Sequence, residues 1–415
     1  VGSIFGVAVS GMMSDYLGRK KTMLFSAVLF SVSAIGCALS NGIADLVIYR
    51  IIGGIGIGVT SVVSPIYISE ISFAQYRGRL VSLYQLAITV GFLGAYLINY
   101  QLLRISENVM IQNPLLNKIF VGEVWRGMLG MEAFPAVIFF LIIFLIPESP
   151  RWLILKKLPD KAHHILKRLY GSDAEASEQI RQTRQVIHAE VRSEWAYLFK
   201  PGIFTAVWVG IAIAVLGQFM GVNAVLYYGP EIFSKTGLSD GDSLFYQVLV
   251  GLVNVVTTMI ALLIIDKAGR KKLVYWGVSG MIASLVSISL YFWIGQSSGL
   301  GPVILLIFFL FYIFCCAISI CAVIFVLLSE MYPIRIRGLA MSLAGFSLWV
   351  GTYLIGQLTP LMLEKLRPAG TFFLFAAMCL PYMWIVWKKI PETTGKSLEE
   401  IEKLWIKQNC GNNES

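Results

Sequence analysis

The segment Asp15-Tyr16-Leu17-Gly18-Arg19-Lys20-Lys21 recurs as Asp266-Lys267-Ala268-Gly269-Arg270-Lys271-Lys272. Each copy lies between two long apolar runs, where Gly18 permits a tight turn. Two further patterns recur at a similar offset of about 250 residues and in the same order. They are Glu70 with Arg77-Gly78, repeated as Glu330 with Arg337-Gly338, and Pro147-Glu148-Ser149, repeated less faithfully as Pro391-Glu392-Thr393. Two parallel halves of six helices each are therefore predicted, as in transporters built from repeats.

The composition indicates that lipid surrounds most of the chain. Of the 415 residues, 57% are hydrophobic and 14% are charged, whereas soluble domains carry about 25% charged residues. A membrane helix needs about 20 mainly apolar residues. The runs that qualify are 22–40, 46–68, 80–102, 127–146, 204–228, 245–265, 273–294, 302–328, 339–361 and 370–388, and residues 1–13 form a shorter eleventh run. An all-α membrane protein is expected.

The net charge of +9 does not indicate nucleic-acid binding, because Lys and Arg form short clusters between the apolar runs rather than a basic stripe. If the runs alternate across the bilayer, all the clusters fall on one side, which the positive-inside rule assigns to the cytoplasm. The clusters are Arg19 to Lys21, Arg77 with Arg79, Lys267 with Arg270 to Lys272, Arg335 with Arg337, and Lys388 with Lys389.

The apolar runs and the polar stretches predict four segments. These are an N-terminal transmembrane half at 1–146, a cytoplasmic helical linker at 147–203, a C-terminal transmembrane half at 204–388 and a cytoplasmic tail at 389–415. The linker is expected to form short amphipathic helices. About 60 residues of the second half precede Asp266, far more than precede Asp15, so the repeat predicts one further helix upstream of Val1.

The positions of the cysteines and histidines predict no metal site. Five of the six cysteines lie inside apolar runs without a C-x-x-C pair, so neither a zinc site nor a disulfide framework is expected. No nucleophile–base pair suggests an enzyme, and no cofactor is expected. The run Gly54-Ile55-Gly56-Ile57-Gly58 lies inside a predicted span, where small residues favour close helix packing over a dinucleotide loop.

Charged residues at the predicted cytoplasmic rim are candidates for a latch that forms in one transport state and opens in the other. The plainer alternative is positive-inside charge, with surface ion pairs worth about 0–1 kcal/mol. The candidate latch residues are Asp15, Arg19, Glu70, Arg77, Glu148, Arg151, Asp266, Arg270, Glu330 and Arg337.

Four motifs together resemble the sugar porter family of the major facilitator superfamily, and the likeness covers nearly the whole chain. They are Gly11-x-x-x-Asp15-x-x-Gly18-Arg19-Lys20, Pro65-x-Tyr67-x-x-Glu70 with Arg77-Gly78, Pro147-Glu148-Ser149-Pro150-Arg151-Trp152-Leu153, and Pro391-Glu392-Thr393-x-Gly395. The chain is most similar to the bacterial xylose and arabinose proton symporters, with the animal glucose facilitators a step further. The resemblance implies the twelve-helix major facilitator fold and alternating-access transport of a pentose or hexose, with proton symport.

A sugar site needs amides that donate and accept, and aromatic faces for the ring. Lone polar residues in membrane spans are functional candidates by default, although buried amides also bond neighbouring helices. On the resemblance, the positions that match sugar contacts are Gln85, Gln218, Asn223, Tyr227, Asn254 and Trp349, and Phe325 stands where the family usually has a Trp.

The chain departs from the family pattern at several of these positions. Gly217 and Leu348 stand in place of amides, and Cys321-Ala322 replaces a Gly-Pro pair. Each lost hydrogen bond would cost about 0.5–1.5 kcal/mol, which predicts weak sugar binding or a less hydroxylated ligand. Without Gly-Pro, the tenth helix is expected to be stiffer.

Arg50 lies a turn inside its span, and two roles remain open for it. In the proton symporters of the family, the matching Arg pairs with an Asp of the first helix, and the alternative is an Arg that reaches the outer interface. The rival functions are a transporter of another small polyol or neutral solute, a facilitator, and a non-transporting sugar sensor. The expected partners are the sugar, H+ and the bilayer of the cell membrane, for a monomer whose full chain has both termini in the cytoplasm.

Overall fold

The computed structural model describes residues 1–73, 77–109, 111–190, 199, 202–295, 301–332 and 336–390. At residues 77–79, 185–190, 266–268, 295, 325–326, 329–330 and 337 only the backbone is described. Within these limits the chain is helical, and ten helices are long and apolar enough to cross a membrane. They coincide with the ten predicted runs, which confirms the all-α membrane architecture. The shorter run at 1–13 lies, apart from Val1, within a 16-residue helix, Gly2–Leu17.

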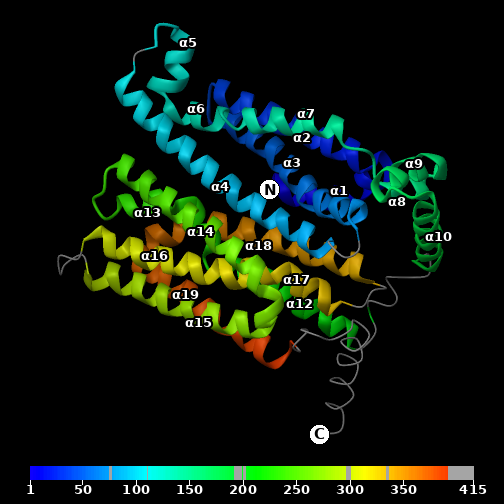
Figure 1. Ribbon diagram of the computed structural model, residues 1–415. Helices are drawn as coiled ribbons and strands as arrows, with labels where there is room; N and C mark the ends of the chain where they lie inside the picture. Colours follow the sequence, from blue (N-terminus) through cyan, green and yellow to red (C-terminus); the bar gives the residue numbers. More distant parts are fainter. Residues whose placement is uncertain are drawn as a thin grey trace. The chain divides into compact units, whose positions relative to one another are not determined.

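The chain divides into two compact units (Figure 1). Unit 1 comprises Val1–Tyr84 and Leu102–Glu194, and unit 2 comprises Gln85–Gln101 and Trp195–Ser415. The helix α4, Arg77–Asn108, contributes residues to both units. The predicted segment boundaries, which follow the chain, remain a prediction.

Unit 1 begins with three helices that pack against one another and ends with the helices of the predicted linker. Its further elements are α1 (Gly2–Leu17), α2 (Arg19–Leu39), α3 (Ile43–Ile71), α5 (Pro114–Asn117), the π-helical turn η1 (Lys118–Gly122), α6 (Val124–Gly130), α7 (Ala133–Leu145), α8 (Pro150–Leu155), α9 (Pro159–Tyr170) and α10 (Asp173–Glu190).

Glycines let α1 and α3 pack closely. A Cβ on Gly58 would lie 2.2 Å from the Ser3 carbonyl oxygen, and one on Gly6 would lie 2.3 Å from the Ile55 carbonyl oxygen. Both contacts are too short for any side chain, so this interface requires glycine. The Gly-rich run at 54–58 therefore serves helix packing, as its place in an apolar span predicts.

The linker helices form a small apolar cluster of their own. The helices α8, α9 and α10 bury Leu153, Ile154, Leu166 and Ile180 among themselves. The helix α9 is amphipathic and ends at Gly171, whose φ of 74° is the left-handed conformation that favours glycine. This part of the linker is therefore helical, and α9 is a short amphipathic helix of the expected kind.

Unit 2 holds the larger apolar core of the described chain. Its elements after α4 are α12 (Ile203–Phe219), α13 (Val222–Ser234), α14 (Asp240–Ala268), α15 (Arg270–Leu290), the π-helical turn η2 (Tyr291–Gly295), α16 (Pro302–Cys316), the π-helical segment η3 (Ala317–Cys321), α17 (Ala322–Met331), α18 (Arg337–Lys365) and α19 (Arg367–Lys388). In this unit α15 packs against α16 and α19, and α12 packs against α18 and α19 (Figure 1).

Two spans of unit 2 are interrupted. The span 203–234 breaks at Gly221, whose φ is 92°, so that α12 and α13 are separate half-helices. The span that begins at Pro302 contains η3, a π-helical turn between two α-helical stretches. A π-turn thus interrupts the tenth helix although Gly and Pro are absent from Ala317–Cys321, and the greater stiffness expected of this helix stays a prediction.

Candidate functional site

Two of the predicted amides meet at the break between α12 and α13. Gln218 is in the last turn of α12, Asn223 is in the first turn of α13, and Asn223 Nδ2 donates to Gln218 Oε1 at 2.7 Å. A hydroxyl of α18 joins them, since Thr352 Oγ1 lies 3.1 Å from Gln218 Oε1 and 2.9 Å from the Leu348 carbonyl oxygen. Three polar side chains therefore share their hydrogen bonds in an apolar part of the unit.

The break is held in place by its neighbours. The Tyr312 hydroxyl donates to the Met220 carbonyl oxygen at 2.7 Å, which satisfies an acceptor that the interrupted helix leaves unpaired. The ring of Phe375 lies so close to Gly221 that a Cβ there would be 2.5 Å from the ring. The positive φ and this contact both require glycine, so the geometry that brings Gln218 to Asn223 is fixed locally.

An aromatic side chain lies beyond the amides on α13. Tyr227 is 49% exposed, one turn after Asn223, and its ring centroid is 6.2 Å from that of Phe92 in α4. An exposed ring beside paired amides can offer its face to an apolar or sugar-like surface.

The remaining substrate-site candidates are in the same unit. Asn254 is buried at 5% exposure in α14, while Gln85 and Trp349 are half-buried in α4 and α18. Of these candidates, Gln218 and Asn223 are joined by a described hydrogen bond. The Phe325 side chain lies outside the described part of the chain.

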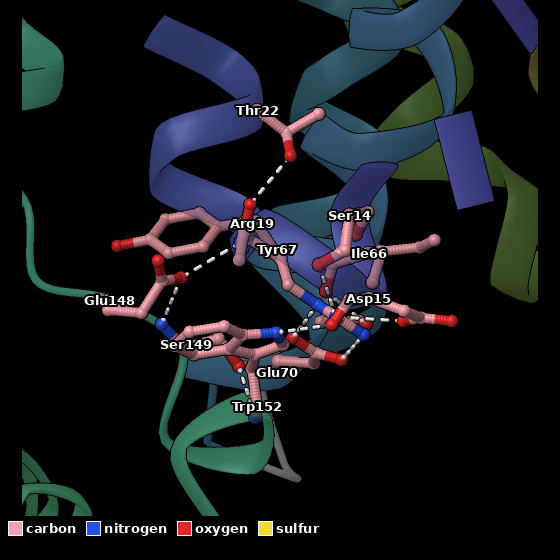
Figure 2. Close-up of polar contacts among 12 residues, drawn as sticks. Ser14, Asp15, Arg19, Thr22, Ile66, Tyr67, Glu70, Glu148, Ser149 and Trp152 are labelled. Atoms are coloured by element: carbon pink, nitrogen blue, oxygen red, sulfur yellow. Dashed lines mark hydrogen bonds and ion pairs between the residues drawn. The ribbon is translucent and has the colours of Figure 1, made fainter. Parts of the chain in front are cut away.

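A second cluster lies at the predicted cytoplasmic rim of unit 1 (Figure 2). The Arg19 guanidinium donates through Nε to Glu70 Oε2 and through Nη2 to Glu70 Oε1, each at 3.0 Å. Its Nη1 lies 3.0 Å from both Asp15 Oδ1 and the Ser14 carbonyl oxygen. Arg19 and Glu70 are 7% and 5% exposed, whereas Asp15 is 73% exposed. The buried pair is thus fully hydrogen-bonded and joins α2 to α3.

Glu148 binds the N-terminus of α2. Its Oε1 accepts from the backbone N–H groups of Arg19 at 3.0 Å, Lys20 at 3.1 Å and Ser149 at 2.9 Å. Unpaired N–H groups and the helix dipole both favour an anion here. Gly18 has a φ of 94°, and a Cβ on it would lie 2.3 Å from Glu148 Oε2, so the carboxylate fits only against glycine.

The segment after Glu148 links the two carboxylates (Figure 2). Ser149 Oγ donates to Glu70 Oε2 at 2.5 Å and accepts from the Trp152 N–H at 3.2 Å, which makes Ser149 the N-cap of α8. The Trp152 indole donates to the Asp15 carbonyl oxygen at 3.0 Å. The described ion pairs of this cluster join helices of one unit.

For several other latch candidates the structure describes the side chain only in part or not at all. The side chains of Arg77, Asp266, Glu330 and Arg337 lie outside the description, as does the segment 391–395. Arg151 is half-buried on α8.

The second copy of the repeated Gly-Arg-Lys sequence has, in its described part, the same backbone turn and the same kind of side-chain contact as the first copy. Gly269 has a φ of 86°, and Arg270 Nη1 donates to the Ile265 carbonyl oxygen at 3.3 Å, as Arg19 does to Ser14. Lys271 Nζ donates to the Trp387 and Ile390 carbonyl oxygens, each at 3.0 Å. The sequence repeat is therefore also a repeat of backbone turns and of contacts from basic side chains.

Arg50 pairs with a carboxylate that sequence reasoning did not select. Arg50 Nη1 lies 3.3 Å from Glu132 Oε1, at the start of α7, and the two side chains are 51% and 53% exposed. The structure thus supplies a described partner for this Arg within unit 1.

Comparison with known proteins identifies the family. The profile described as "Sugar (and other) transporter" matches residues 1–405. The chain belongs to this family. It is 38% identical to the arabinose-proton symporter of Bacillus subtilis over 98% of this chain and 85% of the relative. It is 32% identical to the D-xylose-proton symporter of Escherichia coli over 98% of this chain and 84% of the relative.

Solved structures of the same family have the same fold. The inward-open xylose transporter XylE of E. coli superposes with a TM-score of 0.81 at 31% identity, covering 98% of this chain and 87% of that chain. Another match is XylE, a major facilitator proton:xylose symporter, bound to 6-bromo-6-deoxy-D-glucose, with a TM-score of 0.79 at 31% identity, covering 97% of this chain and 87% of that chain. This member of the sugar transporter family is a multi-pass membrane transporter with the major facilitator fold, not an enzyme.

The structure also identifies polar residues of this family member that sequence reasoning missed. Thr352 gave no signal, because a threonine in a membrane helix can bond its own helix. Arg126 is 7% exposed, and its Nε donates to Glu123 Oε2 at 2.6 Å while Nη1 donates to the carbonyl oxygens of Ala38 and Ser40. Arg126 directly precedes the predicted span 127–146, and sequence reasoning did not select it.

Proposed function

We propose that this sugar transporter carries a pentose or hexose across the cell membrane by alternating access, together with a proton. The observation that carries the proposal is the mutual hydrogen bonding of Gln218, Asn223 and Thr352 at the break between α12 and α13. The relatives named above, which transport arabinose or xylose with protons, support the substrate class and the coupling.

The cluster can exchange its partners for those of a ligand. Gln218 Oε1 accepts from Asn223 Nδ2, so each amide satisfies part of the hydrogen-bonding capacity of the other. Vicinal hydroxyls both donate and accept, and they can therefore replace this bond without leaving a polar group unpaired. The exposed Tyr227 ring is positioned one turn away to cover an apolar face of the sugar ring. Gln85, Asn254, Phe325 and Trp349 complete the proposed site.

A less hydroxylated polyol or another neutral solute is the second candidate, and Gly217 is the observation that favours it. A Cβ on Gly217 would make ordinary contacts, 3.8 Å from Tyr382 and 3.9 Å from Ile320. There is thus local room for a side chain beside Gln218, yet this chain provides no amide there. Leu348 likewise stands where the family pattern has an amide. The Thr352 hydroxyl, which is on the same helix as Leu348, nevertheless bonds Gln218.

The rim cluster is proposed to act as a conformational latch. Arg19 and Glu70 are buried and fully paired, so separating them would leave two charges without partners unless water enters. An equilibrium between a paired, dry state and an open, hydrated state is the type of two-state element that alternating access needs. The clusters of Lys and Arg support a cytoplasmic position for this rim, and the protein is proposed to act as a monomer.

Uptake into proteoliposomes tests the proposal, with labelled xylose, arabinose, glucose, galactose and inositol, with and without an inward proton gradient. We expect saturable uptake of one pentose or hexose that the gradient accelerates. Gln218→Ala should abolish uptake, whereas Gln357→Ala, which removes an exposed amide of α18, should not. If only the double variant Gly217→Gln, Phe325→Trp transports a sugar, the native ligand belongs to another class. If no variant does, the sugar assignment is wrong.

A further inference from the structure

A proline in α13 leaves one carbonyl without its helical partner. Pro230 has no N–H, so the Leu226 carbonyl oxygen four residues earlier receives no bond from it. Two side chains from other helices supply donors instead. The Tyr96 hydroxyl of α4 lies 2.8 Å from this oxygen, and Gln247 Nε2 of α14 lies 3.1 Å from it.

The same arrangement occurs a second time, with α13 as the donor. Pro360 interrupts the hydrogen bonds of α18 and leaves the Gly356 carbonyl oxygen without its helical partner. The Tyr228 hydroxyl of α13 donates to this oxygen at 2.9 Å. The half-helix α13 is thus bonded on one side through its own freed carbonyl and on another side through the freed carbonyl of α18.

In each case a proline leaves a carbonyl oxygen of its own helix without a donor. The donor that replaces the missing N–H comes from a different helix. An unpaired carbonyl in an apolar environment costs several kcal/mol, and it is usually satisfied by a nearby Ser, Thr or water. Here the donors are long side chains of neighbouring helices. Separating α13 from α4, α14 and α18 would therefore break these three hydrogen bonds but no turn of helix.

Close packing fixes two of the donors. Gln247 is fully buried, and a Cβ on Gly229 would lie 1.9 Å from Gln247 Oε1, so only glycine fits there. A Cβ on Gly251 would lie 2.7 Å from the Tyr96 ring, which likewise requires glycine on α14. The side chains are held against α13 by shape as well as by their hydrogen bonds.

The half-helix that they hold carries the proposed site. Asn223 and Tyr227 are on α13, and the only covalent link from α13 back to α12 passes through Gly221, whose φ is 92°. A glycine link of this kind can absorb a change of backbone angle. The lateral bonds of α13 therefore determine where the amide and the ring stand relative to Gln218.

We propose that Tyr96, Gln247 and Tyr228 are positioning residues that clamp α13 and so hold Asn223 and Tyr227 in place relative to Gln218. The proposal rests on the proposed transport function and adds to it the residues that position the site. Each broken bond should shift the clamped–released equilibrium about 3- to 10-fold, the usual net effect of one hydrogen bond.

Hydrogen–deuterium exchange of the full-length protein, without sugar, tests the clamp directly. Tyr96→Phe and Tyr228→Phe should each raise amide exchange within Val222–Ser234 about 3- to 10-fold and leave Ile203–Phe219 unchanged. The matched control is Tyr353→Phe, because Tyr353 is an exposed tyrosine of α18 outside this arrangement. It should change neither segment.

A second variant tests whether Tyr228 holds α13 in place or only supplies a hydrogen bond to an otherwise unpaired carbonyl oxygen. Pro360→Ala restores an N–H that can bond Gly356, and Pro360 is exposed, so no packing is lost. In Tyr228→Phe, Pro360→Ala, thermal stability should return to that of Pro360→Ala alone, while α13 still exchanges fast. In a binding assay, the Kd of the transported sugar should stay raised about 3- to 10-fold.

Two results would overturn the proposal. The first is unchanged α13 exchange in both Tyr→Phe variants, which would mean that the hydroxyls do not hold the half-helix. The second is full recovery of α13 protection in the double variant, which would mean that Tyr228 only satisfies a carbonyl. Neither result depends on transport, so failure of wild-type sugar uptake would reject the proposed function separately.

Discussion

Arg19 and Glu70 form a bidentate ion pair, in which Arg19 Nε and Nη2 each donate to one carboxylate oxygen of Glu70 at 3.0 Å. Their side chains are 7% and 5% exposed, so both charges are removed from water. Such a pair is favourable only while both partners remain and the other lone pairs are satisfied. Ser149 and the Ser14 carbonyl oxygen supply these additional bonds. Removing one charge should therefore cost far more than removing both.

Glu70→Gln should lower the free energy of unfolding by about 3–5 kcal/mol, because it leaves the buried Arg19 charge with only the exposed Asp15 as a charged partner among the described residues. The double variant Glu70→Gln, Arg19→Gln should recover a large part of this loss. Asp15→Asn is the matched control, since Asp15 bonds the same guanidinium but is 73% exposed, and its loss should cost at most about 1 kcal/mol. Thermal unfolding in detergent measures all three, and equal losses for Glu70→Gln and Asp15→Asn would contradict this reading.

Gly18→Ala should destabilise unit 1 by more than about 1 kcal/mol, for two reasons at one position. The φ of 94° is unfavourable for any residue with a Cβ, and that Cβ would lie 2.3 Å from Glu148 Oε2. The carboxylate would then have to leave the N-terminus of α2. Gly11→Ala is the control, because Gly11 is inside α1 with no other atom within 4 Å of its Cβ position, and alanine should be neutral or stabilising there. Melting temperatures that fall equally in both variants would refute the expectation.

Much of the fold follows from the sequence because lipid imposes a simple rule on it. A span must be apolar for about 20 residues, and its backbone groups must bond within the helix. The predicted run 46–68 corresponds to Ile43–Ile71, slightly longer because the helix continues beyond its apolar part. Interruptions are harder to predict. Gly221 is one of many glycines in the spans, and the π-turn at Ala317–Cys321 has neither Gly nor Pro.

The candidate site was only partly predictable for a similar reason. Gln218 and Asn223 stand out because an amide in an apolar run has few alternatives to a functional or interhelical bond. Thr352 does not stand out, since its hydroxyl can bond the Leu348 carbonyl of its own helix. Tyr96 also gave no signal, because its role depends on a carbonyl that Pro230 frees in another helix. Such roles require the relative placement of helices.

Glu132→Gln should abolish the dependence of uptake on a proton gradient while preserving sugar exchange across the membrane. Its carboxylate is the described acidic partner of Arg50, at 3.3 Å. A neutral amide in its place would keep the contact but could not bind a proton. Glu107→Gln removes another exposed carboxylate and should leave coupling intact. Gradient-driven accumulation by Glu132→Gln, measured in proteoliposomes, would exclude this pair as the proton site.

Thr352→Val should weaken binding of the transported sugar about 2- to 10-fold without loss of thermal stability, because one hydrogen bond to the amide cluster disappears. Valine keeps the shape of threonine, so the packing against Gln218 remains. Thr359→Val makes the same change in the same helix, but the Thr359 hydroxyl bonds only the Ile355 carbonyl oxygen, and sugar affinity should not change. Equilibrium binding measured by titration calorimetry compares the two variants. Equal affinities would show that the Thr352 hydroxyl belongs to helix packing, and the proposed site would then rest on Gln218 and Asn223 without it.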